Sequence, residues 1–411
     1  MRVSSLAIAS SALLALSGIS AIAQSGRAAA TSADSTPDPI KIAVGRLDFE
    51  RYKANVKGLT QFGDRRQGTK RNRDAVDWIE AQLKSYGCTN TERITYDYQP
   101  VPRDTTGRGR GGGRAGARTG PRAAQGGGTP RGIRARTGVN NDSLAQPDAK
   151  LRALDSEPSV PGKRQEVYCT KIGTTHPDEM YIVGGHMDGI GWGEAANDDG
   201  SGTALVMELA RVFSSPDIQT DRSIRFILWN NEETGTNGSR AYVQQRQALQ
   251  GKEEPAGSGK YPEPKWLGMI QHDMMMFDHG MPHEDGTLSK EQRPEADVNI
   301  EFQVASKFAA DAQKLAWALA TANDKYATDY PAAVGQHMTN TDSGPFQDVV
   351  PAISVRENDR GTQIGNGWDP HWHQATDLFA TFTDKDFRLG FNAAQTTLGG
   401  LGMLAGLSLK K

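Results

Sequence analysis

Residues 183–202 read VGGHMDGIGWGEAANDDGSG and join the end of an apolar run to a dense group of acidic side chains. Between Ile172 and Ala210 the chain carries seven carboxylates and no Lys or Arg, and four of the seven lie within twelve residues of one another, beside His186. Like charges this close repel one another unless they are solvated, protonated or neutralised. The stretch therefore predicts a site that takes positive charge from outside the polypeptide.

Around this stretch, short apolar runs alternate with helical patterns. The runs are MYIVGG (180–185), SIRFILW (223–229), KWLGMIQ (265–271) and AISV (352–355), and the helical patterns cover 202–214, 238–249 and 305–323. Apolar strands that alternate with helices indicate a largely parallel sheet covered on both faces. We therefore expect an α/β fold, a single three-layer α/β/α domain over residues 38–411 with a mixed, largely parallel central sheet.

Upstream of these strands the composition changes abruptly. Residues 103–136 contain nine Arg, one acidic residue and almost no apolar side chains. Such a run cannot bury enough surface to offset the entropy lost on ordering. We predict a disordered Arg/Gly-rich insertion over residues 103–161, and a flexible segment at 24–37.

The near-neutral net charge hides an acidic folded part. The chain carries −2 in total, and the Arg-rich run contributes +8, so the remainder carries −10. Arg/Gly segments can bind RNA or another polyanion, and that role stays open as an alternative. Because the run lacks interleaved aromatic residues for stacking on bases, we expect a solvated linker and no nucleic-acid partner.

The first residues read as a secretory signal. Arg2 precedes a short apolar run, and the small residues Ala21 to Ala23 suit a cleavage site. A membrane anchor is the alternative, but the run is broken by Ser, and no later run reaches about 18 apolar residues. We expect residues 1–23 to be removed near Ala23, leaving a secreted or periplasmic chain without a membrane span.

The two cysteines are compatible with export. Cys88 opens one strand-like run and Cys169 closes another. If these two strands pair antiparallel, the start of one lies near the end of the other, and an oxidising compartment would allow a disulfide. The sequence leaves open whether the bond forms.

Polar clusters follow three of the apolar runs. His186 and Asp188 follow the first, Glu232 and Glu233 the second, and Asp273 the third. In open α/β sheets, ligands bind beyond the carboxyl ends of the strands. His, Asp and Glu together form a ligand set suited to Zn²⁺, so we expect a metal site at this edge of the sheet.

A pair of metal ions would need a carboxylate to bridge them. Two divalent ions about 3.5–4 Å apart clamp a hydrolytic water between them. The loop AANDDGSG offers Asp198 for the bridge, with Gly200 and Gly202 permitting tight backbone turns.

The ordered motif series resembles that of the co-catalytic zinc aminopeptidase family. The motifs are GGHMD, NDDGSG, NNEETGTNGS, QHD, TDSGPFQDVVPAI and HWHQATD, and the resemblance spans residues 60–100 and 163–400, outside the Arg/Gly insertion. That family also contains glutamate carboxypeptidases, glutaminyl cyclases and non-catalytic receptor ectodomains. The resemblance implies the zinc-aminopeptidase fold, two zinc ions per chain and a peptide substrate.

The resemblance also implies individual roles. His186 and Asp273 would bind one zinc, Glu233 and His373 the other, and Asp198 both. Glu232 would be the general base, taking a proton from a metal-bridging water and later protonating the leaving amine. The Asp188 carboxylate would accept a hydrogen bond from the second ring nitrogen of His186 and fix its tautomer. A cis peptide bond after Asp198 is implied as well.

Residues next to the predicted zinc ligands are expected to support them. Asp199 is interpreted as a backbone-capping acid, and Asp377 as the residue that fixes the loop presenting His373. The family spacing of His and Asp selects His373 over His371 as the ligand. Gln374 departs from the pattern, because many members have Thr or Ser there.

We therefore expect an exported zinc-dependent exopeptidase that hydrolyses a terminal peptide bond, as an aminopeptidase. The first alternative is a carboxypeptidase or dipeptidase of the same fold, for which Arg356 or Arg360 would anchor the substrate carboxylate. A glutaminyl cyclase and a non-catalytic binding ectodomain are further alternatives. The sequence does not determine the oligomeric state or the residue cleaved.

Overall fold

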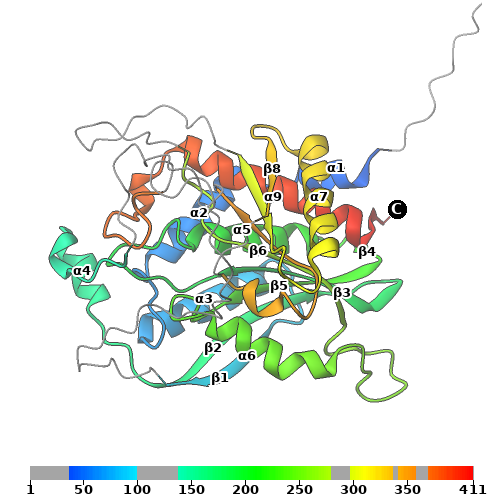
Figure 1. The fold of residues 1–411 in the computed structure, drawn as a ribbon, viewed down its shortest axis with the longest axis horizontal. Helices are drawn as coiled ribbons and strands as arrows, with labels where there is room; N and C mark the ends of the chain where they lie inside the picture. The colour runs from blue at the N-terminus through cyan, green and yellow to red at the C-terminus, as the bar shows by residue number, and fades with distance from the viewer. Residues whose placement is uncertain (1–36, 100–137, 279–296, 337–340, 358–368, 411) are drawn as a thin grey trace, which may run out of the picture. The chain divides into compact units, whose positions relative to one another are not determined.

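An eight-stranded sheet forms the centre of the computed structural model, which describes residues 37–99, 138–278, 297–336, 341–357 and 369–410 (Figure 1). Its strand order is β1-β2-β5-β3-β6-β9-β7-β8. The strands are β1 (Glu92–Tyr98), β2 (Gly162–Lys171), β3 (His176–His186), β5 (Arg222–Trp229), β6 (Lys265–His272), β7 (Val298–Phe302), β8 (Ala332–Gly335) and β9 (Ala352–Arg356). Strands β5, β3, β6 and β9 pair in parallel, whereas β1, β2 and β7 join by antiparallel pairings.

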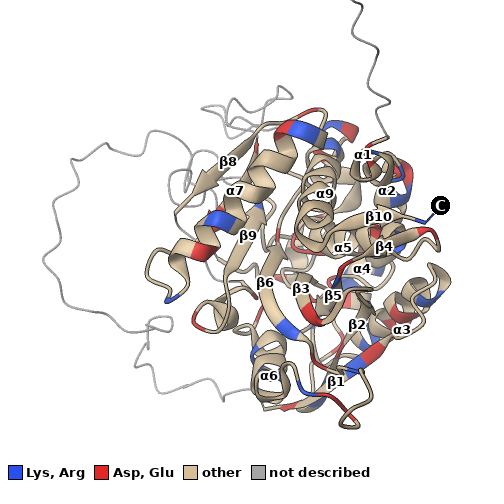
Figure 2. Ribbon diagram, turned by 90° about the vertical axis from the view of Figure 1, so that its right-hand side faces the viewer, with Lys and Arg blue, Asp and Glu red and all other residues tan. Residues whose placement is uncertain are grey.

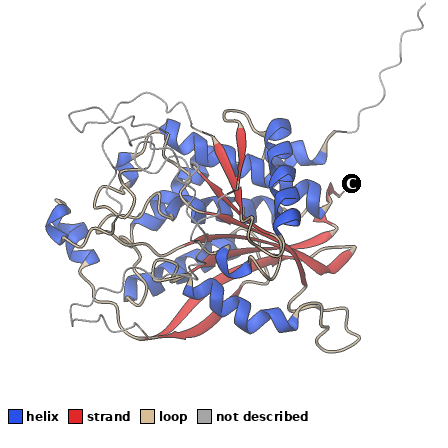
Figure 3. Cartoon of the chain, viewed as in Figure 1, coloured by secondary structure: helices blue, strands red, loops and turns tan. Residues whose placement is uncertain are grey.

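Helices cover both faces of this sheet (Figure 3). The larger core cluster lies under α1 (Pro39–Val44), α2 (Phe49–Thr60), α3 (Lys70–Ser85), α5 (Gly200–Phe213), α7 (Ala309–Tyr326) and α9 (Asp384–Ala405). The smaller cluster lies under α6 (Asn237–Arg246) and the 3₁₀ turn η3 (Gly344–Phe346) on the other face. The expected three-layer architecture with a mixed sheet is confirmed.

The alternation of buried side chains along β5 explains this arrangement. Phe226 and Leu228 pack into the larger cluster, whereas Ile227 and Trp229 pack into the smaller one. Both faces of the strand are therefore apolar, which is why β5 reads in sequence as a continuous apolar run.

The remaining elements are short. They are α4 (Ala149–Asp155), the 3₁₀ turns η1 (Ser143–Ala145), η2 (Gln247–Leu249) and η4 (Phe379–Thr381), and a separate ribbon of β4 (Ile218–Thr220) with β10 (Leu407–Leu409). Among the described helices, none is long and apolar enough to cross a membrane. The predicted signal at 1–23 lies outside the described residues.

The prediction of disorder up to residue 161 is wrong for its last part. Residues 143–145 and 149–155 form η1 and α4, and the Asp148 carboxylate caps α4 by accepting from the N–H groups of Lys150 and Leu151. The Arg-rich composition that suggested disorder ends at residue 136. The helix-capping residue Asp148 lies beyond it, in a stretch of ordinary composition. Residues 103–137 lie outside the described residues.

A disulfide joins Cys88 to Cys169, with a Cα–Cα distance of 6.0 Å. The pairing of Glu92 with Tyr168 in the antiparallel β1–β2 ribbon brings the two cysteines together. The bond that the sequence left open is therefore present. It ties the α3–β1 connection to the central sheet.

Helix α3 carries both basic and acidic residues (Figure 2). Arg93 on β1 pairs with Glu80 on α3, and Lys70 pairs with Asp74 within that helix. These pairs compensate acidic side chains of α3 with neighbouring cations.

Candidate metal centre

Two groups of ligand-type side chains meet beyond the carboxyl ends of the parallel strands. One comprises His186, Asp198 and Asp273, and the other Asp198, Glu233 and His373. Within each group the ligand-type atoms all lie within 4.8 Å of one another. The five residues predicted as metal ligands are therefore brought together.

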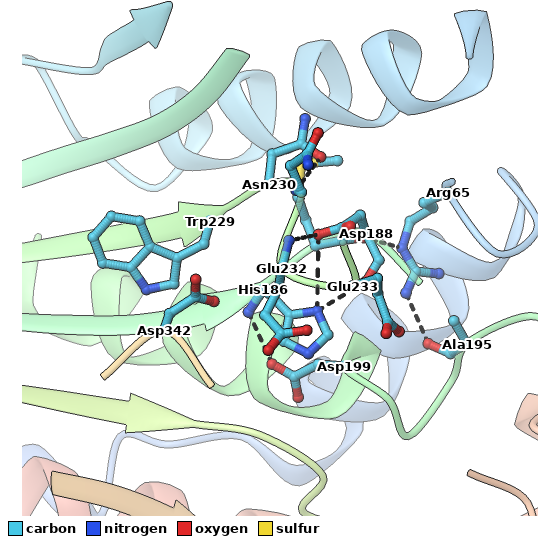
Figure 4. A network of polar contacts seen from close by, with 12 residues as sticks. Arg65, His186, Asp188, Ala195, Asp199, Trp229, Asn230, Glu232, Glu233 and Asp342 are labelled. Atoms are coloured by element: carbon cyan, nitrogen blue, oxygen red, sulfur yellow. Dashed lines mark hydrogen bonds and ion pairs between the residues drawn. The ribbon is translucent and has the colours of Figure 1, made fainter. Parts of the chain in front are cut away.

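The strands and the loops after them position these side chains. His186 is the last residue of β3, Asp273 follows β6, and Glu233 follows β5. Asp198 lies in the loop before α5, and His373 in a loop before η4. Figure 4 shows His186, Glu232 and Glu233 converging from neighbouring strand ends.

Asp198 lies between the two groups. Its Oδ1 is 3.3 Å from His186 Nε2, and its Oδ2 is 3.0 Å from His373 Nε2. Glu233 Oε2 is 2.8 Å from His373 Nε2, and Asp273 Oδ1 is 3.9 Å from His186 Nε2. One carboxylate thus faces both histidines, as a bridging ligand would.

Electrostatics in this site are dominated by buried carboxylates. Burial opposes protonation of His186, but Asp198 and Asp273 outweigh it and raise the pKa of His186 well above its ordinary value. Glu233 and Asp198 likewise overcome burial and raise the pKa of His373. Burial raises the pKa of Glu233 to about 7, against the attraction of His373. The carboxylates around both imidazoles thus favour positive charge at this position.

The residues fit a divalent metal pair. Glu233 Oε1 is buried without a hydrogen-bond partner among the described residues. Both imidazoles direct Nε2 at carboxylate oxygens, and neutral imidazole with carboxylates is a ligand set for Zn²⁺. A bound cation would supply the positive charge that these carboxylates favour.

Asp188 contacts His186 differently from the prediction. His186 Nδ1 lies 2.9 Å from the Asp188 main-chain oxygen but 3.9 Å from its carboxylate. The carboxylate instead accepts from the Glu232 N–H at 3.0 Å (Figure 4). Asp188 therefore fixes the imidazole through its carbonyl and the start of the Glu232–Glu233 loop through its side chain.

Glu232 is the residue that the sequence predicts as the general base. Burial, reinforced by Asp342 and Glu233 and opposed by His186, raises the pKa of Glu232 well above its ordinary value. Its side chain lies on the same side as His186 in Figure 4. The electrostatic influence of His186 on Glu232 shows that the two side chains lie in one site.

The Asp198 loop is held from three directions. Asp199 caps α5 by accepting from Gly202 N, and it also accepts from His186 N and Met274 N. The capping role of Asp199 is thus confirmed, and the peptide bond between Asp198 and Asp199 is cis.

The contacts of Asp377 agree with its predicted role, whereas the prediction for the two glycines needs correction. The Asp377 N–H donates to Gln374 O, and the Asp377 carboxylate accepts from Asn197 N and Asp198 N, so Asp377 ties the loop that carries His373 to the loop of Asp198. Gly200 and Gly202 lie in the first turn of α5 and form no tight turn. At Gly202 a Cβ would lie 2.7 Å from His272 O, so close packing excludes it.

Arg356 was proposed as a substrate anchor, and the structure gives it another contact. Its guanidinium is buried, with Nη2 2.9 Å from Asp273 Oδ2 and Nε 3.9 Å from Glu301 Oε2. Arg356 therefore compensates the charge of a ligand carboxylate and is not free to bind a substrate. Arg360 lies outside the described residues.

Two further residues near the site received no role from the sequence. Arg65 is fully buried and donates to the carbonyls of Met187, Glu194 and Ala195 (Figure 4). Asp342 accepts from Ser239 Oγ, and its charge acts on Glu232. Asp342 belongs to the quoted motif TDSGPF and could have been found there, whereas no pattern in the sequence marks Arg65.

Among the described residues, no histidine other than His186 and His373 belongs to either ligand group. His371 Nδ1 lies 2.8 Å from Thr376 Oγ1, and His272 contacts Gly184 O and Thr397 Oγ1. The preference for His373 over His371 agrees with the geometry. His279 and His283 lie outside the described residues.

Comparisons with known proteins agree with this geometry. The pattern of Peptidase family M28 matches residues 167–394, more than half of the chain. Aminopeptidase YwaD of Bacillus subtilis is 44% identical over 68 residues, which cover 16% of this chain and 14% of that protein. Carboxypeptidase Q of Xenopus laevis is 32% identical over 73 residues, or 18% of this chain and 16% of that protein.

Similarity of fold extends much further than similarity of sequence. A zinc aminopeptidase from Bacillus subtilis superimposes with a TM-score of 0.56 at 14% identity, over 87% of this chain and 95% of that one. The curated relatives, by contrast, are matched over less than a fifth of their length.

Proposed function

The chain belongs to peptidase family M28, and from that premise we propose that it is an exported zinc-dependent aminopeptidase that binds two zinc ions. Relatives named as an aminopeptidase and as a carboxypeptidase both match it. Family membership alone therefore does not determine whether the chain cleaves at the amino or the carboxyl end of a peptide. The contacts within the site have to distinguish the two.

A single observation carries the proposal. The Asp198 carboxylate faces His186 with one oxygen and His373 with the other, and each histidine has a further acidic partner. This arrangement offers two adjacent three-residue sites with one shared ligand. His186, Asp198 and Asp273 would hold one zinc, and Asp198, Glu233 and His373 the other.

Bound zinc supplies Lewis acidity, which polarises a carbonyl and lowers the pKa of water to about 7. The chain's own residues then handle the protons. Glu232 accepts a proton from the attacking water and donates it to the nitrogen of the leaving amine. Asp188 holds Glu232 in place through the Glu232 N–H, so that Asp188 is a positioning residue.

The contact of Arg356 favours action at the amino end of the peptide. A carboxypeptidase needs a cation to bind the substrate carboxylate, and of the two candidate arginines the one in the described residues, Arg356, is paired with Asp273. Carboxylates near the metal ligands would instead attract a free α-amino group.

Export is supported by the disulfide between Cys88 and Cys169. Disulfides persist in oxidising compartments and are rare in the cytosol. We propose that residues 1–23 act as a signal peptide and are removed near Ala23, and that residues 38–411 form the peptidase domain.

The test compares blocked and unblocked peptides. We expect the zinc-loaded protein to release the first residue from peptides with a free amino group, and to be inactive on the same peptides after N-acetylation. Amidation of the carboxyl end should have little effect. Cleavage of N-acetylated peptides that stops on carboxyl amidation would identify a carboxypeptidase instead.

A further inference from the structure

A segment outside the family resemblance contacts the loop that carries His373. We call residues 138–146, which follow the Arg/Gly-rich run directly, the strap. Asn140 N donates to His373 O at 2.9 Å, Gln374 Nε2 donates to Gly138 O at 2.9 Å, and Gln146 Nε2 donates to Ala375 O at 3.0 Å. Three consecutive residues of the loop that carries His373 are thus hydrogen-bonded to the strap.

The strap also bonds a second loop of the site. Asn140 Nδ2 donates to Gly191 O at 3.1 Å, and Gln146 Nε2 donates to Trp192 O at 2.8 Å. Gly191 in turn packs against the His373 backbone so closely that a Cβ on it would lie 2.4 Å from His373 C. The strap therefore joins two loops that already touch each other.

Gln146 is the central residue of this connection. It is 0% exposed, although its neighbours on both sides are exposed. Its Nε2 serves two carbonyls, and its Oε1 accepts from Asp148 N at 3.0 Å. Removal of the amide would leave the buried carbonyls of Trp192 and Ala375 without this donor, and buried polar groups are rarely left unpaired.

His373 depends on such support. A metal-binding histidine usually donates its other ring N–H to a carboxylate or a carbonyl, which fixes the ring. His373 Nδ1 is buried and has no hydrogen-bond partner among the described residues. The ring stacks on Trp372 with centroids 4.1 Å apart, and the backbone at φ 56° is outside the ordinary helical and extended regions. Apart from the contacts of Nε2 with Asp198 and Glu233, the backbone and this stacking set the orientation of the ring.

The strap accounts for the departure at position 374. Many members of the family that the sequence resembles have Thr or Ser after the last ligand, and a side chain of that length could not reach as far as Gln374 does to Gly138. The unusual residue and the insertion contact each other. We propose that the strap positions His373 for zinc binding, with Gln146 and Asn140 as positioning residues. This inference rests on the proposed zinc-dependent function.

Zinc affinity in the full-length protein tests the inference. The variants are Gln146→Met, which keeps the chain length but removes the donors, and Asn140→Ala. Asn141→Ala is the matched control, because Asn141 lies in the strap but its Nδ2 donates only to Val139 O. His373→Ala identifies which of two zinc ions belongs to the His373 site during titration with a chelator.

We expect Gln146→Met to weaken zinc binding at the His373 site by up to about 10-fold, the lower end of the loss on removing a direct partner of a ligand, because Gln146 acts through the loop backbone. Asn140→Ala should weaken it less, because it removes the Nδ2 bond to Gly191 O and keeps the main-chain bond to His373 O. The other zinc should be unaffected, kcat should fall with KM little changed, and Asn141→Ala should match the wild type. Unchanged affinity in both variants, or equal weakening of both zinc ions, would overturn the inference. A wild type that binds no zinc would instead refute the proposed function, and the inference with it.

Discussion

A methyl group at position 191 should disable one half of the metal centre. The Cβ of Gly191→Ala would lie 2.4 Å from His373 C and 2.5 Å from His373 O, whereas ordinary contacts begin at 3.4 Å. Both atoms belong to the backbone, so that no side chain can turn away. The His373 loop must therefore move by about 1 Å, which is several times the tolerance of about 0.2 Å on metal–ligand distances.

The expected result is a protein that keeps the zinc of His186 and Asp273 and loses the other. A misplacement of about 1 Å can cost about 100-fold in rate, so kcat/KM on an aminoacyl substrate should fall by at least that factor. Zinc content of the dialysed protein, measured with the kinetics, checks both statements.

A control variant separates this clash from backbone strain. Gly191 has φ 108°, and Ala there costs about 1–2 kcal/mol through the backbone alone. Gly162 has φ 124° with no atom within 4 Å of a built Cβ, so Gly162→Ala should lose stability but keep both zinc ions and the activity. If Gly191→Ala retained two zinc ions and wild-type kcat/KM, the packing argument would be refuted.

Three other predictions follow from contacts described above. Reduction of the Cys88–Cys169 bond, which spans 81 residues, should lower the free energy of unfolding by about 4 kcal/mol through loop entropy; equal urea midpoints with and without reductant would contradict this. Burial lowers the pKa of His272 to about 4 in the folded chain, below about 6.5 in the unfolded chain. The unfolded chain thus binds more protons between these values, so the free energy of unfolding should fall by about 3 kcal/mol from pH 7 to pH 4. The zinc-free His272→Gln variant should lack this decrease, and a pH profile identical to that of the wild type would show that His272 does not cause it. Zinc binding at pH 7 should release protons, because the pKa values of His186 and His373 are raised; a pH-indicator titration without release would show that both imidazoles were already neutral.

Much of the site could be predicted because parallel strands align their carboxyl ends. Since both faces of the sheet are buried, β3, β5 and β6 read as apolar runs, and the polar residues that end them must share an edge. This rule places His186, the Glu232–Glu233 pair and Asp273 at one edge, and the motif resemblance then selected Glu233 as the ligand of the pair. His373 does not follow from the rule, because its loop follows no apolar run, and only the motif resemblance selected it.

The remaining features depend on contacts between segments far apart in the sequence. Arg356 ends β9 as an ordinary charged residue, and its pairing with Asp273 becomes visible only when β9 lies beside β6. The Asp188 carboxylate lies 3.9 Å from the imidazole, a detail of rotamer and loop path that no spacing encodes. The strap was hidden by the Arg-rich composition next to it, because composition describes the run and not the residue at which it ends.

The central claim is that Glu232 is the base of a two-zinc aminopeptidase. The most direct test measures zinc content and hydrolysis of an aminoacyl substrate together, for the wild type, for Glu232→Gln, and for Glu254→Gln as an exposed control. We predict near two zinc ions in all three proteins, wild-type rates for Glu254→Gln, and a loss of about 10²- to 10⁴-fold in kcat for Glu232→Gln. A metal-free wild type, or a Glu232→Gln variant as active as the wild type, would contradict the account.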